Sequence, residues 1–303
     1  MARRSEKLKV LVSLHKGYGI GDAVQVSAVL RHLKKYRSNW SVDFQAEIGK
    51  SCIGRDLTDN QFAFGDPYPS RHYDAEAEIL LFDTWANWGD RPNTRVSSCL
   101  HERFNLGWDS DCGRYHVTIR KESADAAKTL LHSGKKDAYN KIVAVHYEGV
   151  SSPTKKNLTH AQADEICKEI IRLGYEPLIL DWLAKSPLIH RRLRSPKHWG
   201  MDIEMICAVI DQCCAFVGID SGPSKCASAT NTPALVTWTG HHPAPFHDPA
   251  PNTTHLVPQG YHGLEPVCND KGVIEWFEKH YSVIKYEKDP VVEIRRWLCN
   301  ILK

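Results

Sequence analysis

The chain has 303 residues, a formal net charge of +3 and 42% hydrophobic residues. This length suits two ordinary α/β domains better than one. The composition is that of a globular protein and excludes a disordered or collagen-like chain, while so weak a positive charge argues against nucleic acid as a partner. No run reaches the ~20 apolar residues of a membrane span, so we expect no transmembrane segment.

Ten cysteines are spread along the chain, and none forms a C-x-x-C pair. The usual zinc spacing is therefore absent, and we expect no metal site. Several of the cysteines lie in apolar stretches, where a reduced thiol packs as a small hydrophobic group. The apolar run at residues 10–14 is too short for a signal peptide. Together these features predict a cytoplasmic protein.

The first half begins as a parallel α/β unit. Residues 9–14 form a compact β run, and residues 15–21 form a loop with three glycines. Apolar residues at helical spacing then predict a helix over residues 22–36. A polar stretch at 135–141 is the candidate linker to the second half. The other elements expected in this half are strands at 42–48, 79–82 and 115–119 and a helix at 124–131.

In the second half, strands alternate with helices. Thr159 and Asp202 are candidate N-caps for two helices, the first ending at Gly174 and the second at Ile210. Alternating strands and helices predict a doubly wound parallel sheet. The strands are expected at 142–146, 177–180, 215–219 and 234–238, and further helices at 222–230 and 291–302.

The strongest motif is a strand followed directly by a tight turn and a helix. The run Asp220-Ser-Gly-Pro223 follows the predicted strand 215–219, and proline suits the first turn of a helix. Ligands of open α/β sheets bind at the carboxyl ends of strands, and free N–H groups at a helix start suit a phosphate. An ordinary strand-turn-helix corner is an equally good reading of the spacing alone.

A second polar loop joins the predicted strand 142–146 to the helix after Thr159. It carries Lys155 and Lys156, whose ammonium groups are placed to reach a diphosphate. Three hydroxyl residues add donors to the same loop, namely Ser151, Ser152 and Thr154. Taken alone, the loop also fits a solvated connection.

The third motif is the glycine-rich run Gly17-Tyr-Gly-Ile-Gly-Asp22. It matches neither the dinucleotide fingerprint nor the P-loop. It does place the carboxylate of Asp22 at a helix start, where an N-cap is its structural role. As a functional group, Asp22 would be a general base that accepts the proton of an acceptor hydroxyl.

Together, the three motifs resemble the bacterial heptosyltransferases, glycosyltransferase family nine. Gly19-Ile-Gly-Asp22 matches the family's Gly-x-Gly-Asp loop, and Asp220-Ser-Gly-Pro-Ser-Lys225 matches its Asp-Thr-Gly-Pro-x-His motif except at the end. Lys156-Asn-Leu-Thr159 matches a Lys-Arg-Trp-Pro-like segment only at the lysine and the helix start. Residues 50–130 give no match.

The resemblance implies a GT-B fold, in which two Rossmann-like, doubly wound domains face a central cleft. The boundaries that we expect are 1–134 for the acceptor-side domain, 141–285 for the nucleotide-sugar-binding domain, and 286–303 for a C-terminal helix packing back across the domains. The implied reaction is metal-independent, inverting transfer of a sugar from a nucleotide diphosphate to an acceptor hydroxyl. The nucleotide sugar is then a substrate, and no cofactor is expected.

Carried over by position, the resemblance makes Asp22 the catalytic base and Lys156 a diphosphate contact. Lys225 stands where the family has a histidine, and it keeps the positive charge without sharing a proton near neutral pH. The expected donor- and phosphate-binding residues are Lys155, Lys156, Asp220, Ser221, Gly222, Pro223 and Lys225. The residues expected to line the cleft are Gly19, Gly21, Ser151, Ser152, Gly240, His241 and His242.

Other readings of the sequence remain open. Asp109-Ser-Asp111 imitates a D-x-D metal motif, and His241, His242 and His247 lie close together in sequence; we expect neither to bind metal. A sugar-nucleotide epimerase of similar architecture and a non-catalytic nucleotide-binding protein are the alternative functions. The sugar, the nucleotide and the acceptor, whether glycan, lipid-linked or another hydroxyl compound, are not specified by the sequence.

Overall fold

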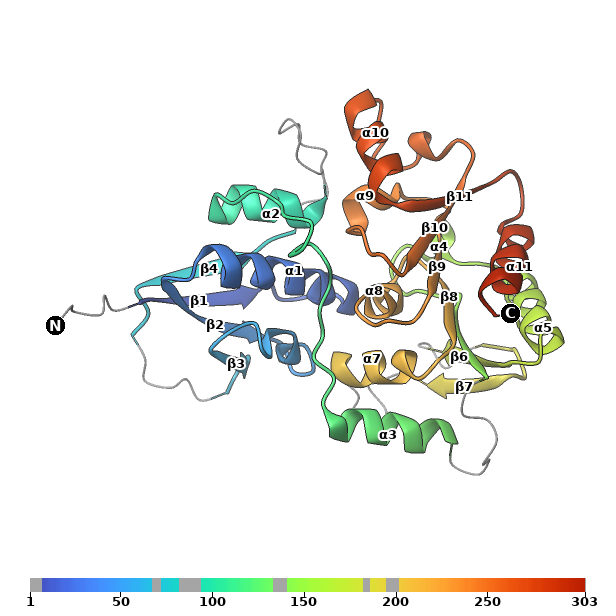
Figure 1. Cartoon of the computed structure of the whole chain (residues 1–303), viewed down its shortest axis with the longest axis horizontal. Helices are drawn as coiled ribbons and strands as arrows, with labels where there is room; N and C mark the ends of the chain where they lie inside the picture. Colours follow the sequence, from blue (N-terminus) through green and yellow to red (C-terminus); the bar gives the residue numbers. More distant parts are fainter. Residues whose placement is uncertain are drawn as a thin grey trace.

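The computed structural model describes residues 7–66, 72–81, 94–132, 141–181, 186–194 and 202–302. Two separate parallel sheets lie side by side, each covered by helices (Figure 1). Phe82, at the end of one expected strand, and residues 135–140 of the expected linker lie outside the described ranges.

The smaller sheet has the strand order β3-β2-β1-β4, with every pairing parallel. The central strand β1 is rich in Val and Leu and is buried over most of its length, as expected for a strand with neighbours on both sides. Its elements are β1 (Leu8–Leu14), α1 (Ile20–Tyr36), β2 (Trp40–Ala46), η1 (Ser51–Gly54), β3 (Asn60–Ala63), β4 (Ala75–Ile79) and α2 (Arg95–Phe104).

The larger sheet has seven parallel strands in the order β11-β10-β9-β8-β5-β6-β7. The two central strands, β5 and β8, are buried at every residue and have the bounds predicted from sequence. The strands are β5 (Ile142–His146), β6 (Glu176–Asp181), β7 (Arg191–Arg194), β8 (Ala215–Ile219), β9 (Ala234–Thr237), β10 (Thr253–Pro258) and β11 (Ser282–Tyr286).

Two helices around the larger sheet, α5 and α7, begin at residues whose side chains cap the first turn. Thr159 and Asp202 cap α5 and α7 as predicted, each accepting a backbone N–H from inside the first turn. Gly174, with a φ of 86°, ends α5 in the left-handed conformation that glycine tolerates. The helices are α4 (Pro153–Lys156), α5 (His160–Arg172), α7 (Ile203–Asp211), α8 (Gly222–Ser228), α9 (Pro243–Phe246), η2 (Tyr261–Gly263), α10 (Lys271–His280) and α11 (Pro290–Ile301).

Two helices do not lie where the proposed domain division would put them. Helix α3 (Lys121–His132) packs on α7, below it in Figure 1 and away from the smaller sheet. Helix α11 was expected to pack back across the domains. Instead its apolar side chains, such as Ile294 and Leu298, join the core between α5 and the larger sheet. The apolar face of α11 is therefore buried against the larger sheet, and the helix does not need to cross to the other half of the chain.

Two expected strands differ from the structure. Residues 115–119 alternate in burial but form no strand. The His116 N–H donates to Ser27 Oγ at 2.8 Å, and just beyond the segment the Arg120 N–H donates to Glu204 Oε1 at 2.9 Å. The segment thus threads between α1 and α7. The apolar run at 79–82 is also shifted, since β4 ends at Ile79.

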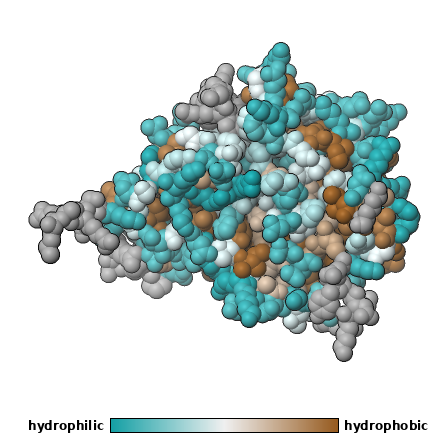
Figure 2. Space-filling model, in the orientation of Figure 1, coloured by the Kyte–Doolittle hydropathy of each residue, from teal (hydrophilic) through white to brown (hydrophobic). Residues whose placement is uncertain are grey.

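The face in Figure 2 is mainly hydrophilic, with scattered apolar residues. Such scattering is normal for globular proteins. None of the helices in the described part of the chain has the length and apolar character needed to cross a bilayer.

Candidate active site

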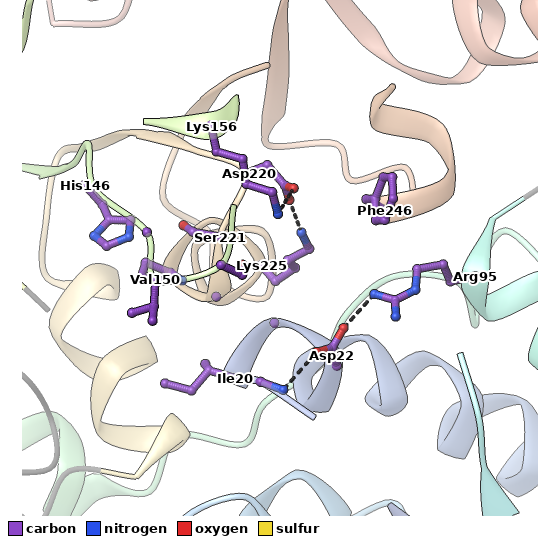
Figure 3. Close-up of a pocket in the computed structure, with 16 residues that line it drawn as sticks. Ile20, Asp22, Arg95, His146, Val150, Lys156, Asp220, Ser221, Lys225 and Phe246 are labelled. Atoms are coloured by element: carbon purple, nitrogen blue, oxygen red, sulfur yellow. Dashed lines mark hydrogen bonds and ion pairs between the residues drawn. The ribbon is translucent and has the colours of Figure 1, made fainter. Parts of the chain in front are cut away.

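A pocket of about 330 Å³ lies between the amino ends of α1 and α8 (Figure 3). It is also lined by Arg95 of α2, by the loop after β5 and by Phe246 of α9. The strands β1, β5 and β8 all end at the loops that line it, which is where open parallel sheets place their ligands.

The pocket wall contains three fixed cations and two carboxylates. The cations are Arg95, Lys156 and Lys225, and the carboxylates are Asp22 and Asp220. The side chains therefore leave one unit of positive charge uncompensated, which favours an anionic ligand.

Asp22 occupies the third position of α1, and Gly19 is the N-cap. Asp22 Oδ2 accepts the backbone N–H of Gly19 at 2.8 Å, which closes the first turn. We expected Asp22 itself to cap the helix; the cap is Gly19 because the aspartate reaches back to it from one turn along. Asp22 Oδ1 accepts from Arg95 Nη1 at 2.6 Å, and the carboxylate keeps 24% of its side chain exposed to the pocket.

Asp220 stands at the end of β8 between two lysines. Lys225 Nζ contacts its Oδ1 at 2.5 Å, and Lys156 Nζ contacts its Oδ2 at 2.8 Å. Burial alone would raise the pKa of the Asp220 carboxyl. The charge of Lys225, with contacts from His241 and Lys156, instead holds that pKa well below its usual range. Burial lowers the pKa of the Lys225 ammonium, and the Asp220 charge opposes that shift.

The start of α8 offers fewer free N–H groups than its sequence suggested. Pro223 has no N–H, and the Ser221 N–H donates to Ser224 Oγ at 3.2 Å. The Ser221 hydroxyl donates to the carbonyl of Ile219. Positive charge for a ligand therefore comes mainly from the two lysines.

The amino ends of α1 and α8 meet glycine to glycine. A Cβ on Gly222 would lie 2.9 Å from Ile20 Cβ, and a Cβ on Gly21 would lie 3.2 Å from Lys225 Cδ. Any side chain at Gly222 would push the two helices apart. Gly222 of the first motif and Gly21 of the third motif thus allow α1 and α8 to approach closely, which brings the two halves of the site together.

The loop after β5 places only part of its predicted set in the pocket. Lys156 and Ser151 line the pocket. Lys155 instead pairs at the surface with Glu265, at 2.6 Å. Ser152 is exposed at the N-cap position of α4 and is not among the residues that line the pocket. Lys155 and Lys156 are the last two residues of α4, and adjacent residues of a helix point in different directions, which separates the two lysines.

The segment after β9 was expected to line the cleft as a whole. His241 lies 3.7 Å from Asp220 Oδ2, beside the lysines. Gly240 packs on the backbone of Lys155, where a Cβ would meet the carbonyl oxygen at 2.6 Å. His242 does not line the cleft: it is fully buried among Tyr261 and Phe277, and burial lowers its pKa to about 3.

Arg95, Phe246 and His146 line the pocket but were not singled out from the sequence. Arg95 could have been noticed in the sequence, because a cation in the first turn of a helix is unfavourable beside the helix dipole and needs an anionic partner. His146 is buried, and its Nδ1 donates to the carbonyl of Leu180 at 2.9 Å. Burial lowers the pKa of His146 to about 4, so it lines the pocket as a neutral ring.

The metal-like motifs have structural partners. Asp109 accepts from Lys35 Nζ at 2.7 Å and from the Tyr36 hydroxyl, and its other oxygen binds two backbone N–H groups. His247 is buried with Nε2 3.0 Å from Ser228 Oγ. Within the described ranges, no three His, Cys, Asp or Glu side chains are grouped as a metal would require.

No protein-family model matches the chain, and no curated protein matches its sequence. Solved structures do match. The chain is similar to a family 9 glycosyl transferase from Veillonella parvula, with a TM-score of 0.64, 11% identity and coverage of 97% of both chains. The chain has the GT-B fold.

Two further structures support this fold. The E. coli ADP-heptose LPS heptosyltransferase II has a TM-score of 0.62 and 12% identity, over 97% of this chain and 98% of that one. The E. coli heptosyltransferase WaaC with ADP has a TM-score of 0.52 and 14% identity, over 90% and 99%. The resemblance to family nine is thus confirmed in three dimensions, and at these identities it concerns the fold.

Proposed function

We propose that this protein is a metal-independent, inverting glycosyltransferase that moves a sugar from a nucleotide diphosphate to an acceptor hydroxyl. One observation carries the proposal: Asp22 lines the same pocket as Lys156 and Lys225, although they come from different halves of the chain. Displacement at a sugar carbon needs such a pair of groups, a base for the nucleophile and a cation for the leaving group.

The lysines act on the leaving group. When the bond between the sugar and the β-phosphate breaks, its electron pair stays on the phosphate oxygen and negative charge grows there. Lys156 is the more accessible lysine, with 14% of its side chain exposed, and would contact that oxygen. Lys225, 6% exposed, would add its charge from beneath. Because Asp220 holds both ammonium groups in place, little reorganisation is needed as the charge develops.

Asp22 acts on the incoming group. The acceptor oxygen attacks the anomeric carbon from the face opposite the diphosphate, which inverts that carbon. Its proton passes to the Asp22 carboxylate as the new C–O bond forms. Both oxygens of Asp22 are held by donors, so the carboxylate faces the pocket in a fixed orientation.

In this proposal, the smaller sheet and its helices form the acceptor side, and the larger sheet with its helices, α3 among them, forms the donor side. Adenosine diphosphate sugars are the first donors to test. The structural neighbours include one solved with ADP and TibC in complex with ADP-D-β-D-heptose. The lysine at position 225, where the family has histidine, makes the sugar itself an open question, so uridine, guanosine and thymidine diphosphate sugars belong in the same screen.

The test combines binding with turnover. Sugar nucleotides are first screened by thermal shift, because a ligand that binds only the folded chain raises Tm. The donor that binds is then incubated with an acceptor panel and followed by mass spectrometry. Asp22→Asn should keep the Tm shift and reduce transfer by at least about 100-fold. Asp125→Asn, an exposed carboxylate on α3, is the matched control and should transfer normally.

Three results would contradict the proposal. Unchanged transfer by Asp22→Asn would show that Asp22 is not the catalytic base. A donor that is altered with no acceptor present would indicate an epimerase. Binding without turnover across the whole panel would indicate a non-catalytic nucleotide-binding protein.

A further inference from the structure

We propose that Arg95 is a positioning residue for this transfer: it fixes the Asp22 carboxylate in the pocket wall, and Phe246 from the other half of the chain fixes Arg95. The inference rests on the function proposed above, because it concerns the same pocket. It goes further in assigning a task to a residue in the stretch of sequence that matched no motif.

The two oxygens of Asp22 are held from two directions. The Gly19 N–H, within α1 itself, holds Oδ2 at 2.8 Å, and Arg95 Nη1, from α2, holds Oδ1 at 2.6 Å. One contact alone would leave the carboxylate free to rotate about χ2, which is a broad torsion for aspartate. With both contacts present, the plane of the carboxylate is set. Arg95 supplies the half of this restraint that α1 cannot.

Arg95 is held in turn by groups on several sides. Its Nη2 donates to the carbonyl of Leu81 at 3.5 Å, and its guanidinium carbon lies 5.8 Å from the centre of the Phe246 ring. Only 12% of its side chain is exposed. Phe246 also contacts the ring of His241 at 4.9 Å between centroids. A flat guanidinium suits such a site because it can pack on a ring face and donate from its edge at the same time.

The backbone that carries Arg95 is also anchored to the larger sheet. Thr94, the N-cap of α2, donates its hydroxyl to Asp248 Oδ1 at 2.7 Å in a fully buried contact. Asp248 follows α9, which carries Phe246. The segment 243–248 therefore contacts the start of α2 at two points. Asp248 binds Thr94, and Phe246 contacts Arg95. The orientation of Asp22 thus depends on contacts made by the donor side.

The position of Arg95 at the start of α2 is electrostatically unfavourable, and its contact with the Asp22 carboxylate offsets that cost. A cation at the first residue of a helix meets the positive end of the helix dipole. Lysine would carry the same charge but would place a single ammonium on a flexible stem. A guanidinium can contact the Phe246 ring and donate to Asp22 from its edge at the same time. Arg95→Lys should therefore recover only part of what Arg95→Ala loses.

The experiment uses Arg95→Ala and Arg95→Lys in the full chain, with Arg103→Ala, at the exposed far end of α2, as the control. We expect Arg95→Ala to lower kcat by about 100-fold, the size of effect that a displaced catalytic group produces. The KM for the donor should stay within about twofold, because the lysines are untouched. Arg95→Lys should lie between Arg95→Ala and the unaltered chain, and Arg103→Ala should match the unaltered chain.

A crystal structure of Arg95→Ala gives a second readout that needs no turnover. We expect the Asp22 carboxylate to leave its present orientation or to occupy more than one. A carboxylate that stays in place, or an unchanged kcat, would overturn the positioning role. A rise in donor KM with kcat unchanged would also overturn it, since Arg95 would then be a donor-binding residue. If the unaltered chain transfers no sugar at all, the proposed function fails, and the crystal structure still decides whether Arg95 orients Asp22.

Discussion

At the scale of single residues, the charged groups at the end of β8 are unusual in being almost fully inside the protein. The side chains of Asp220 and Lys225 are 4% and 6% exposed. Removing charges from water is costly, and replacing such a pair by apolar groups is often neutral. Removing one partner is different, because it leaves the other charge buried and poorly compensated. The pair is therefore weak evidence for stability and good evidence for a site that needs fixed charge.

Lys225→Met tests this reasoning. We expect it to lower the free energy of unfolding by about 3 kcal/mol, because Asp220 then keeps only Lys156 as a close cation. Affinity for a nucleoside diphosphate should fall about tenfold with the lost charge. Urea unfolding and calorimetric titration measure the two effects. The double variant Asp220→Asn with Lys225→Met should recover at least half of the lost stability; equal or greater loss in the double variant would mean that repacking, not unpaired charge, is responsible.

The residue scale also shows what sequence reasoning can and cannot find. Asp22, Lys156 and Asp220 lie in short motifs beside strand ends, and all three line one pocket. Lys155 lies in the same motif as Lys156 but pairs with Glu265, and His242, which follows the predicted strand 234–238, lies in the core. Position along a loop does not fix side-chain direction. Arg95 lies in no motif at all, and only folding brings it to Asp22.

At the scale of elements, the site depends on how closely two helices approach. The start of α8 lies against the start of α1, and the atoms nearest to a Cβ on Gly222 belong to Ile20 and Gly21. Both helices carry their catalytic candidates within one turn of this contact. Small displacements there act on Asp22 and Lys225 together.

Gly222→Ala should therefore harm both stability and transfer. A methyl group 2.9 Å from Ile20 Cβ must move one helix, and overpacking of this kind costs about 1–3 kcal/mol. The shift should also reduce kcat by at least about tenfold, as the two halves of the site separate. Gly107→Ala is the matched control, because a Cβ there meets no atom within 4 Å. If the two alanine variants unfold at the same urea concentration and turn over equally, the close approach has no importance.

Secondary structure was predictable where burial is complete or a cap is strong. β5 and β8 are buried at every residue and read clearly as apolar runs, and α5 and α7 begin at capping side chains. β10 and β11 were missed because polar residues interrupt their apolar pattern. Residues 115–119 were predicted as a strand from the same alternation that real strands show. Their hydrogen bonds go to side chains of other elements, which no local pattern reveals.

At the scale of the whole molecule, two buried acidic groups link the halves. Glu204 of α7 is fully buried and accepts from Arg55, from Ser123 and from Arg120. Burial would raise its pKa, but these donors together lower it to about 2. Asp248, also buried, accepts from the hydroxyls of Thr94 and Tyr115. The two contacts hold the halves at points far apart in the sequence.

Buried histidines should make the whole molecule acid-labile. Burial lowers the pKa of His146 to about 4 and the pKa values of His242 and His247 to about 3. In the unfolded chain, a histidine binds a proton below about pH 6.5. Between pH 6.5 and about 4, the unfolded chain therefore binds more protons than the folded chain, so the free energy of unfolding falls as the pH falls. Each histidine contributes a loss of about 1.4 kcal/mol per pH unit in this window.

Asp248 works in the opposite direction. Burial raises its pKa to about 6, so between pH 6 and about 4 the folded chain holds a proton that the unfolded chain releases, and this stabilises the fold as the pH falls. Three histidines outweigh one carboxyl, and urea midpoints should drop steadily from pH 6.5 to pH 4.5. His242→Gln should flatten that drop, whereas His280→Gln, at an exposed position, should leave it unchanged. Urea midpoints that hold steady or rise over this range would mean that the buried rings gain access to water or to acidic partners before the chain unfolds.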